Sequence, residues 1–401
     1  MTRGEQWRWR RVPATAQEIP NPLRGQYEDR LKRFSRKLIP HSDNILPGLS
    51  RMMPACVCRG GNCNQPTHRT RDRTVLSRIQ RAPQTATGLV AFALAGLALA
   101  SRYLPITNQV VLLTAALSPY LMLCGPLSVV LLALARRWIL AIVAVGLTVA
   151  TLSVQLPLYR GSDAARTAGV GLRVISANLR EGQADPGYLV RSAREQADVL
   201  AFQELTPQEV DRLSAAGLDA TFPYRWLDPR AGASGVGVWS RLPMHAAKRI
   251  GGYTSALVSA RIRIAGISID PTVVVAHITG PWPQPIDGWR RELDRLPVTL
   301  VEVAEQTGGG SVIVAGDLNS TTDMRPFRNL LRNGYRDAAE QSGAGIEPTF
   351  PADWRLPPLI AIDHILTRSC TATSLRTIKI PGSDHRGLAA TVMIARSSPS
   401  P

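Results

Sequence analysis

Cysteine is scarce in this 401-residue chain, and its distribution limits what disulfides can contribute. The chain has five cysteines, and Cys370 is the single one after residue 160. The C-terminal part therefore cannot hold an internal disulfide, although this count leaves its redox compartment open. Internal sequence repeats are also lacking, which argues against a repeat architecture.

Acidic residues are absent from residues 88–160, where four arginines carry the only charge. Residues 1–87 hold 17 Lys/Arg and 6 Asp/Glu, a net charge of +11. Of the total of +17, only +2 is left for residues 161–401. The high overall charge belongs to the N-terminal part, so it does not indicate that the C-terminal part binds nucleic acid.

Three long apolar runs lie within residues 86–159. They are Ala86–Ser101, Val110–Ala135 and Trp138–Leu158. Spanning a membrane takes about 20 apolar residues, so we predict three transmembrane helices here, with a buried helical core as the alternative. The preceding residues 1–85 are rich in Arg and Pro and are predicted to form a basic, mostly disordered leader.

The distribution of arginine predicts the orientation of these helices. The basic leader and Arg136-Arg137, which join the second and third runs, belong in the cytoplasm by the positive-inside rule. Three spans then place everything after Tyr159 outside the cytoplasm. We therefore expect an integral cytoplasmic-membrane protein with an extracytoplasmic C-terminal domain.

Residues 160–170 are predicted to be a linker, and residues 171–396 show the mixed pattern of a globular α/β domain. Expected strands and helices follow one another without strict alternation, which favours packed sheets flanked by helices. The apolar–polar alternation of Leu257–Ile264 is typical of an exposed or edge strand. Ile286–Glu305 is the longest amphipathic stretch, and Pro297 could kink or divide it.

The stretch from Ser311 to Ser320 carries the first functional signal. A buried strand over residues 312–315 runs through Gly316 to Asp317 and Asn319. Residues two apart on an extended segment share a face, so both side chains should point to one place. A carboxylate with a carboxamide suits a hard metal ion or a phosphate oxygen, while an ordinary polar turn is the alternative.

Polar residues of the same type follow other expected strands of this domain. Each has an ordinary explanation as a turn, cap or core residue, but their recurrence at strand ends indicates a shared site. They are Asn178, Glu204, His277, the pair Asp363-His364, and Ser383-Asp384-His385.

The ordered set of these motifs resembles the endonuclease/exonuclease/phosphatase superfamily. The residues that carry the resemblance are Asn178, Gln203-Glu204, Gly316–Asn319, Ile362-Asp363 and Ser383–His385, within about residues 170–396. The resemblance implies a four-layer α/β sandwich with two mixed central sheets. It also implies hydrolysis of a phosphoester, assisted by Mg²⁺ or Mn²⁺.

The resemblance also implies roles for the site residues. Asn178, Glu204 and Asp384 would hold the metal ion, while His277, Asp317, Asn319, Asp363 and His385 would be catalytic. Neighbouring residues on extended backbone point to opposite faces, so Asp384 cannot orient His385, and Asp363 is the family-equivalent candidate. His364 faces away from Asp363 by the same alternation. Whether Asp317 or His385 accepts the proton stays open.

We therefore expect a membrane-anchored phosphodiesterase or phosphatase whose substrate could be a lipid head group. A membrane-tethered nuclease is one alternative, and a non-catalytic domain that binds a phosphorylated ligand is another. The sequence lacks basic, aromatic-interleaved loops that would follow a nucleic-acid backbone. It also shows no identifiable carboxylate partner for His277. Both absences favour the first reading over the nuclease, and the oligomeric state stays open.

Overall fold

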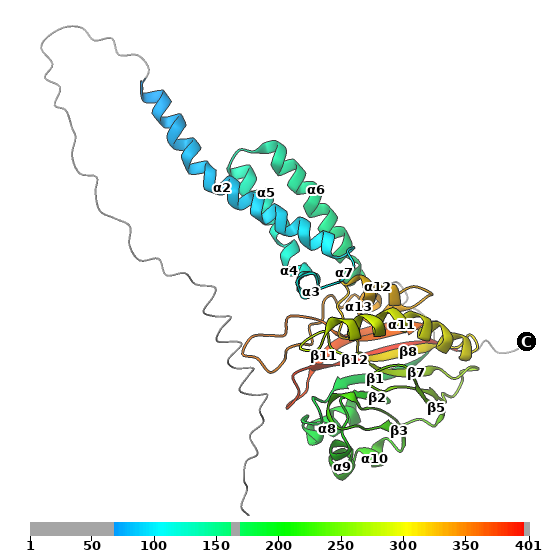
Figure 1. Ribbon diagram of the computed structural model, residues 1–401. Coiled ribbons are helices and arrows are strands. Elements are labelled where there is room, and N and C mark those ends of the chain that lie inside the picture. The colour runs from blue at the N-terminus through cyan, green and yellow to red at the C-terminus, as the bar shows by residue number, and fades with distance from the viewer. Residues whose placement is uncertain (1–67, 162–168, 397–401) are drawn as a thin grey trace, which may run out of the picture. The chain divides into compact units, whose positions relative to one another are not determined.

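The computed structural model describes residues 68–161 and 169–396 (Figure 1), and these described residues belong to one unit. Most of the predicted leader lies outside the described residues. Helix α2 begins at His68, so residues 68–85, predicted to be mostly disordered, are helical instead. Pro83 lies inside this helix, and five arginines precede it there, a residue type that favours helix.

Helices make up the first described part of the chain. They are α2 His68–Ser101, α3 Gln109–Ala116, α4 Ser118–Met122, α5 Cys124–Leu134, α6 Trp138–Gln155 and α7 Pro157–Arg160. Two segments, Arg81–Ser101 and Trp138–Gln155, are long and apolar enough to cross a membrane, and a third crossing is possible if α3 and residues 118–134 count as one span. That pair is bent by 65°. The bend precedes Pro119, whose ring cannot continue the preceding helix.

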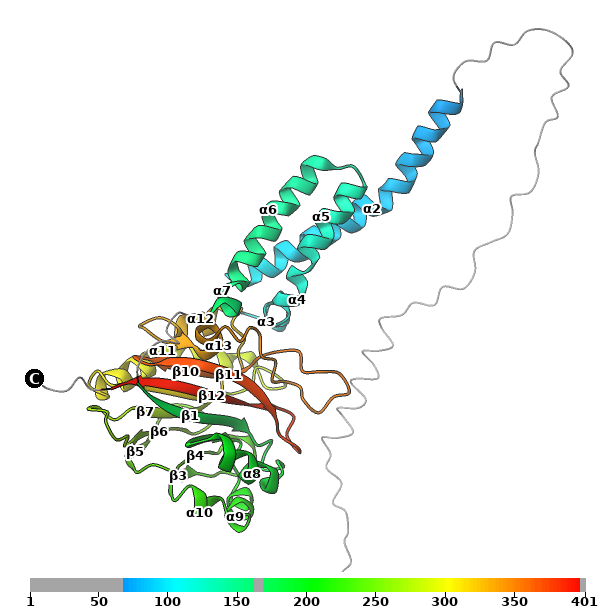
Figure 2. The same cartoon turned by 180° about the vertical axis from the view of Figure 1, so that it is seen from behind.

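Two mixed six-stranded sheets form the second part (Figures 1 and 2). The first has the order β11-β12-β1-β2-β4-β3 and the second β5-β6-β7-β8-β10-β9. The strands are β1 Gly169–Asn178, β2 Val199–Gln203, β3 Tyr224–Asp228, β4 Val236–Ser240, β5 Met244–Ile250, β6 Leu257–Ile262, β7 Thr272–His277, β8 Val312–Asp317, β9 Arg336–Asp337, β10 Asp363–Arg368, β11 Thr371–Lys379 and β12 Arg386–Ala395.

The alternation of side chains along the central strands sets the layers. In β2, Val199 and Ala201 enter the core between the sheets, while Leu200 and Phe202 join the core under the outer helices. Strand β8 alternates in the same way on the other sheet, where Ile313 faces the core between the sheets and Val314 faces the core under the helices. Apolar residues on both faces require cover on both sides. The four-layer α/β sandwich with two mixed sheets is therefore confirmed.

Helices flank the two sheets. They are α8 Pro186–Gln196, α9 Pro207–Ala215, α10 Leu218–Thr221, α11 Ile286–Gln306, α12 Arg325–Leu330 and α13 Ala338–Ser342, with a 3₁₀ turn η2 at Gly232–Ser234. Residues of α8 to α10 share a core with the first sheet, and residues of α11 and α12 share one with the second.

Two sequence expectations about these elements are wrong. Strand β6 is not an edge strand, because it lies between β5 and β7, and its polar Ser259 is buried. Pro297 does not divide α11, which runs unbroken through it. The buried face of that helix, with Trp289, Leu296 and Leu300, packs on both sides of the proline and offsets its missing hydrogen bond.

Candidate active site

The strand ends that carry the predicted site residues meet at one edge of the sandwich. In the parallel pair β1–β2, Asn178 lies opposite Gln203, which directly precedes Glu204. In the parallel pair β7–β8, His277 lies opposite Asp317. Strand β10 runs antiparallel to β8 and starts with Asp363 opposite that same aspartate. The topology therefore brings these polar side chains from both sheets together.

Gly316 permits β7 and β8 to approach each other at this edge. A methyl group on Gly316 would lie 1.8 Å from the carbonyl oxygen of Ala276, a distance that no non-bonded contact tolerates. Glycine is therefore required here for the backbone contact. The result is that His277 stands beside Asp317, and their nearest side-chain atoms, Nε2 and Oδ2, are 3.8 Å apart.

Asn178 connects the two sheets through its side chain. Its Nδ2 donates hydrogen bonds to Oε1 of Glu204 at 3.0 Å and to Oδ2 of Asp317 at 3.1 Å. Its Oδ1 accepts one from the backbone N–H of Arg180 at 2.9 Å. Both amide protons are thus used to hold two carboxylates, and only Oδ1 keeps a free lone pair for a ligand.

Glu204 sits directly after β2 in a left-handed backbone conformation, with φ of 55°. A non-glycine residue rarely adopts this region, and such residues cluster at functional sites. The conformation turns its carboxylate toward the site, where Oε2 accepts a hydrogen bond from the backbone N–H of Glu181 at 2.8 Å. Glu204 is thereby fixed at both carboxylate oxygens.

His385 is held by Asp363, the partner that the family resemblance implies. Its Nδ1 lies 2.8 Å from Oδ2 of Asp363, and both side chains are buried. The ring of Phe350 stacks at 4.9 Å between centroids. On the other side, Nε2 of His385 lies 3.8 Å from Oδ2 of Asp317. The imidazole is therefore fixed with Nε2 directed at the centre of the site.

Asn319 reaches the site by a different route from the one expected. Strand β8 ends at Asp317, and Asn319 adopts a left-handed conformation with φ of 46°. The argument from two residues on one extended strand is therefore wrong. The loop is instead closed by hydrogen bonds from the backbone N–H of Asn319 to Oδ1 of Asp317 and from its Nδ2 to the carbonyl of Ile278, both at 2.8 Å. Oδ1 of Asn319 is left for a ligand.

Asp384 lies at the margin of the site, and its side chain is 29% exposed. Its carboxylate is 4.0 Å from Nε of Arg180, which also forms a 3.0 Å ion pair with Asp353. Sequence reasoning missed Arg180. A cation two residues beyond Asn178 is the only signal that could have found it, because Asp353 and Asp384 are remote in sequence.

Comparison with known proteins supports the assignment that these residues suggest. A sequence profile of the endonuclease/exonuclease/phosphatase family matches residues 172–385, just over half of the chain. The chain belongs to this family. A search of curated proteins finds no match to the chain.

Solved structures of family members are similar to this one. D. rerio TDP2 with 14 humanizing mutations shares 21% identity over 55% of this chain and 98% of its own, with a TM-score of 0.47. An endonuclease/exonuclease/phosphatase from Bacteroides vulgatus shares 15% identity over 56% of this chain and 99% of its own, with a TM-score of 0.47. SmcL shares 14% identity over 55% of this chain and 98% of its own, with a TM-score of 0.43.

The electrostatics of the family site follow from burying several carboxylates together. Burial, and next the carboxylate of Asp363, raise the pKa of Asp317 to about 6. Burial alone would lower the pKa of His385, but Asp363 and Asp317 outweigh it and raise that pKa to about 10. Burial also raises the pKa of Glu204 and lowers that of His277. The site therefore favours added positive charge.

The residues present fit a hard divalent cation. Carboxylate oxygens of Asp317 and Asp363 lie within 4.8 Å of each other and of a ring nitrogen of His385, and Glu204 lies beside Asp317 through Asn178, so carboxylates gather at this point. Oδ1 of Asp363 is buried with no hydrogen-bond partner in the described part of the chain. Carboxylate and amide oxygens are the ligands that Mg²⁺ and Mn²⁺ prefer. Divalent-metal dependence is general in this family.

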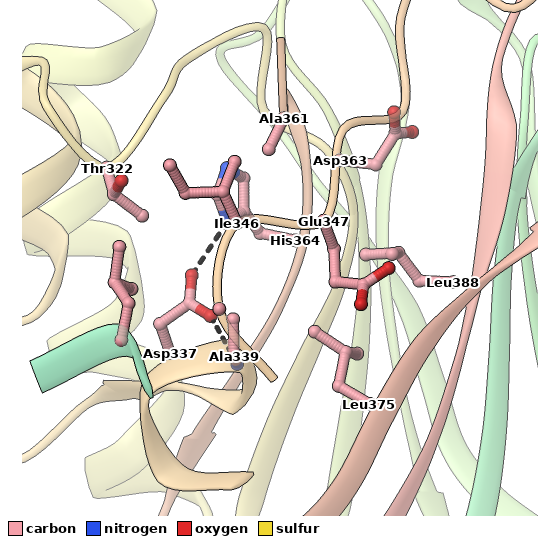
Figure 3. A pocket seen from close by; sticks show the side chains of 12 residues that line it. Thr322, Asp337, Ala339, Ile346, Glu347, Ala361, Asp363, His364, Leu375 and Leu388 are labelled. Atoms are coloured by element: carbon pink, nitrogen blue, oxygen red, sulfur yellow. Dashed lines mark hydrogen bonds and ion pairs between the residues drawn. The ribbon is translucent and has the colours of Figure 1, made fainter. Parts of the chain in front are cut away.

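A second buried histidine, His364, points away from the site, as expected. Figure 3 shows it beside a hollow, joined to Asp337, while the carboxylate of Asp363 points elsewhere. Nδ1 of His364 lies 2.7 Å from Oδ2 of Asp337, and Nε2 lies 2.8 Å from the carbonyl oxygen of Ser320. With an acceptor at each nitrogen, this residue anchors the loop after β8 and has no free atom for a substrate.

Proposed function

We propose that this protein is a membrane-anchored phosphoester hydrolase that depends on a divalent metal ion. The observation that carries the proposal is the meeting of Glu204, Asp317 and His385 at one edge, with Asn178 and Asp363 holding them. A site fixed by so many hydrogen bonds is preorganised for one substrate geometry.

The chain's residues divide into two groups by position. Glu204, Oδ1 of Asn178 and Asp384 would hold the ion, which when bound neutralises phosphate charge and lowers the pKa of water. His277, Nε2 of His385 and the amide of Asn319 surround the place for the phosphoryl group.

Geometry favours different tasks for Asp317 and His385. Because His385 has one carboxylate at Nδ1 and another near Nε2, it is held as a donor and suits a contact to a phosphate oxygen. Asp317 has one oxygen bound to Asn178 and the other to the backbone of Asn319, so it is fixed as an acceptor. We therefore assign Asp317 as the general base that takes the proton from the attacking water.

The helical part supports anchoring with the catalytic domain outside the cytoplasm. Arg102, after the end of α2, and Gln155, at the end of α6, both contact the buried carboxylate of Asp323 in the catalytic domain. Those two helix ends therefore belong on the domain's side. Between these two helix ends the chain passes through Arg136-Arg137, which favour the cytoplasmic side. The bent segment from α3 to residue 134 must then cross the membrane back to the cytoplasm, and α6 must cross it outward again.

Hydrolysis of a soluble diester by the full chain in detergent tests this function. Bis(p-nitrophenyl) phosphate should be cleaved with Mg²⁺ or Mn²⁺, and chelation should abolish the rate. The variant Asp317→Ala should lose activity. The control Asp211→Ala, on helix α9 that covers the first sheet, should keep it. Metal-dependent binding of phosphate without turnover by the wild-type protein would instead support a non-catalytic binding domain.

A further inference from the structure

Three large apolar side chains stand exposed on two loops near the active site. Trp282 follows β7 and is 66% exposed, and Trp354 and Leu356 lie between α13 and β10 with exposures of 62% and 63%. We call these three residues the apolar rim. Large apolar groups exposed on loops that border one site point to contact with a partner or a membrane.

Both loops touch site residues at their bases. A methyl group on Gly280 would lie 3.7 Å from Oδ1 of Asn319, so the loop that bears Trp282 begins beside that side chain. The second loop begins at Phe350, which stacks on His385. Two residues before Trp354, the backbone N–H of Ala352 donates to the carbonyl of Asp384 at 2.6 Å. The apolar rim therefore borders the place where a substrate enters.

The same loops are bonded to the bent helix pair. Nε2 of Gln109 in α3 donates to the carbonyl of Pro281 at 2.8 Å, next to Trp282. The hydroxyl of Tyr120 in α4 donates to the carbonyl of Leu359 at 2.7 Å, three residues after Leu356. Helix α3 exposes apolar side chains of its own, with Val110 74% exposed. Both loops of the rim are thus bonded to a bent helix pair that is long and apolar enough, taken together, to cross a membrane.

We propose that the apolar rim lies in the interfacial region of the bilayer that holds the helices, and that the site acts on the phosphoester head group of a lipid in that membrane. This inference rests on the proposed function and on membrane anchoring. Tryptophan prefers this interfacial depth, where its ring is half in hydrocarbon and its N–H meets water. Arg355, exposed between Trp354 and Leu356, is suited to lipid phosphate.

A nucleic-acid substrate fits these features less well. Exposed aromatic rings also stack on bases, but such sites follow the backbone with a basic groove. Residues 161–401 carry a net charge of only +2, and both loops are fixed to apolar helices. The observations therefore favour a lipid, and nucleic acid becomes one outcome of the test.

The position of the rim is tested by fluorescence of the full chain in phosphatidylcholine–phosphatidylglycerol vesicles. Lipids brominated in their acyl chains should quench part of the tryptophan emission. The fraction of tryptophan emission that these lipids quench should be smaller in the double variant Trp282→Phe/Trp354→Phe. It should not shrink in the control Trp226→Phe, whose residue lies on β3 of the other sheet. Equal quenching in wild type and the double variant would overturn the proposal. This measurement needs no catalysis, so it stands apart from the proposed function.

The substrate class is tested by comparing rates on vesicle lipid and on bis(p-nitrophenyl) phosphate. We expect Trp282→Ser/Trp354→Ser to lower the ratio of vesicle rate to soluble rate by about tenfold or more. Tyr224→Ser should leave the ratio unchanged, because this exposed aromatic starts β3 opposite Ser240, at the sheet end away from Glu204.

Three outcomes separate the possibilities. A ratio that does not fall, with soluble activity present, would refute the lipid assignment while the hydrolase function stands. A wild-type rate on single-stranded DNA that exceeds the vesicle rate and depends on both tryptophans would refute it in favour of a nuclease. Hydrolysis of no phosphoester at all would refute the proposed function itself.

Discussion

The pairing of His385 with Asp363 provides the sharpest test of the proposed mechanism. The two side chains are 2.8 Å apart, and only 7% and 1% of their surfaces are exposed. Solvent therefore does not compete for the hydrogen bond between them. We expect Asp363→Asn, which keeps the shape, to release the orientation of the imidazole, and His385→Ala to remove the group itself.

The size of the effect follows from the role. Loss of a positioned donor that stabilises charge on a transition-state oxygen costs about 10²–10³-fold in rate. That range corresponds to about 3–4 kcal/mol of activation free energy. If Asp363 acts only through His385, the double variant should be no more than about threefold slower than His385→Ala alone, because residues that act as a unit are not additive.

The second buried pair supplies a matched control. His364 and Asp337 are 2.7 Å apart and equally buried, but they lie outside the site. Asp337→Asn should therefore lower the melting temperature while kcat changes by less than about threefold. Steady-state kinetics on bis(p-nitrophenyl) phosphate at saturating Mg²⁺, with melting curves for each variant, would measure both. Losses that multiply in the Asp363→Asn/His385→Ala variant would refute a shared role.

Three other predictions concern metal, anchoring and orientation. Glu204→Gln should raise the Mg²⁺ concentration for half-maximal rate, and excess metal should restore part of kcat; an unchanged metal dependence would remove this residue from the ion site. Asp323→Ala removes the buried partner of Arg102, which costs about 3–5 kcal/mol of stability. The melting temperature in detergent should therefore fall by several degrees, and an unchanged melting temperature would show that the ion pair does not form in solution. An alkaline phosphatase fused to the C-terminus should be active and a green fluorescent protein dark, whereas the reverse would overturn the topology.

The sequence is a good guide within regular strands, where side chains alternate between the two faces of the sheet. Strands β2 and β8 read as apolar runs because each faces a core on both sides. The same alternation predicted that the adjacent Asp384 would not face His385, and the family resemblance supplied Asp363 as its partner. The inferences from alternation depend only on local backbone geometry, which the sequence pattern reports directly.

Sequence reasoning fails where the backbone leaves regular structure. Glu204 and Asn319 both lie just beyond strands in left-handed conformations, and no pattern of apolar residues encodes them. Arg180 was missed because its partners are remote in sequence. Arg102 pairs with Asp323, 221 residues later, and no local pattern points to that partner. Contacts of this length are decided by packing and not by local propensity.

The helices and the catalytic domain share a core, and this determines how the protein should be studied. Ile106 and Leu112 belong to the same buried cluster as Trp289 and Phe327 of the domain. A fragment starting near residue 165 would expose that cluster to water. Burying a large apolar side chain contributes about 1.5–3 kcal/mol, so the loss would be comparable to the stability of a whole domain. The lipid and metal experiments therefore require the full chain, because the surface that closes the domain core is supplied by the helices.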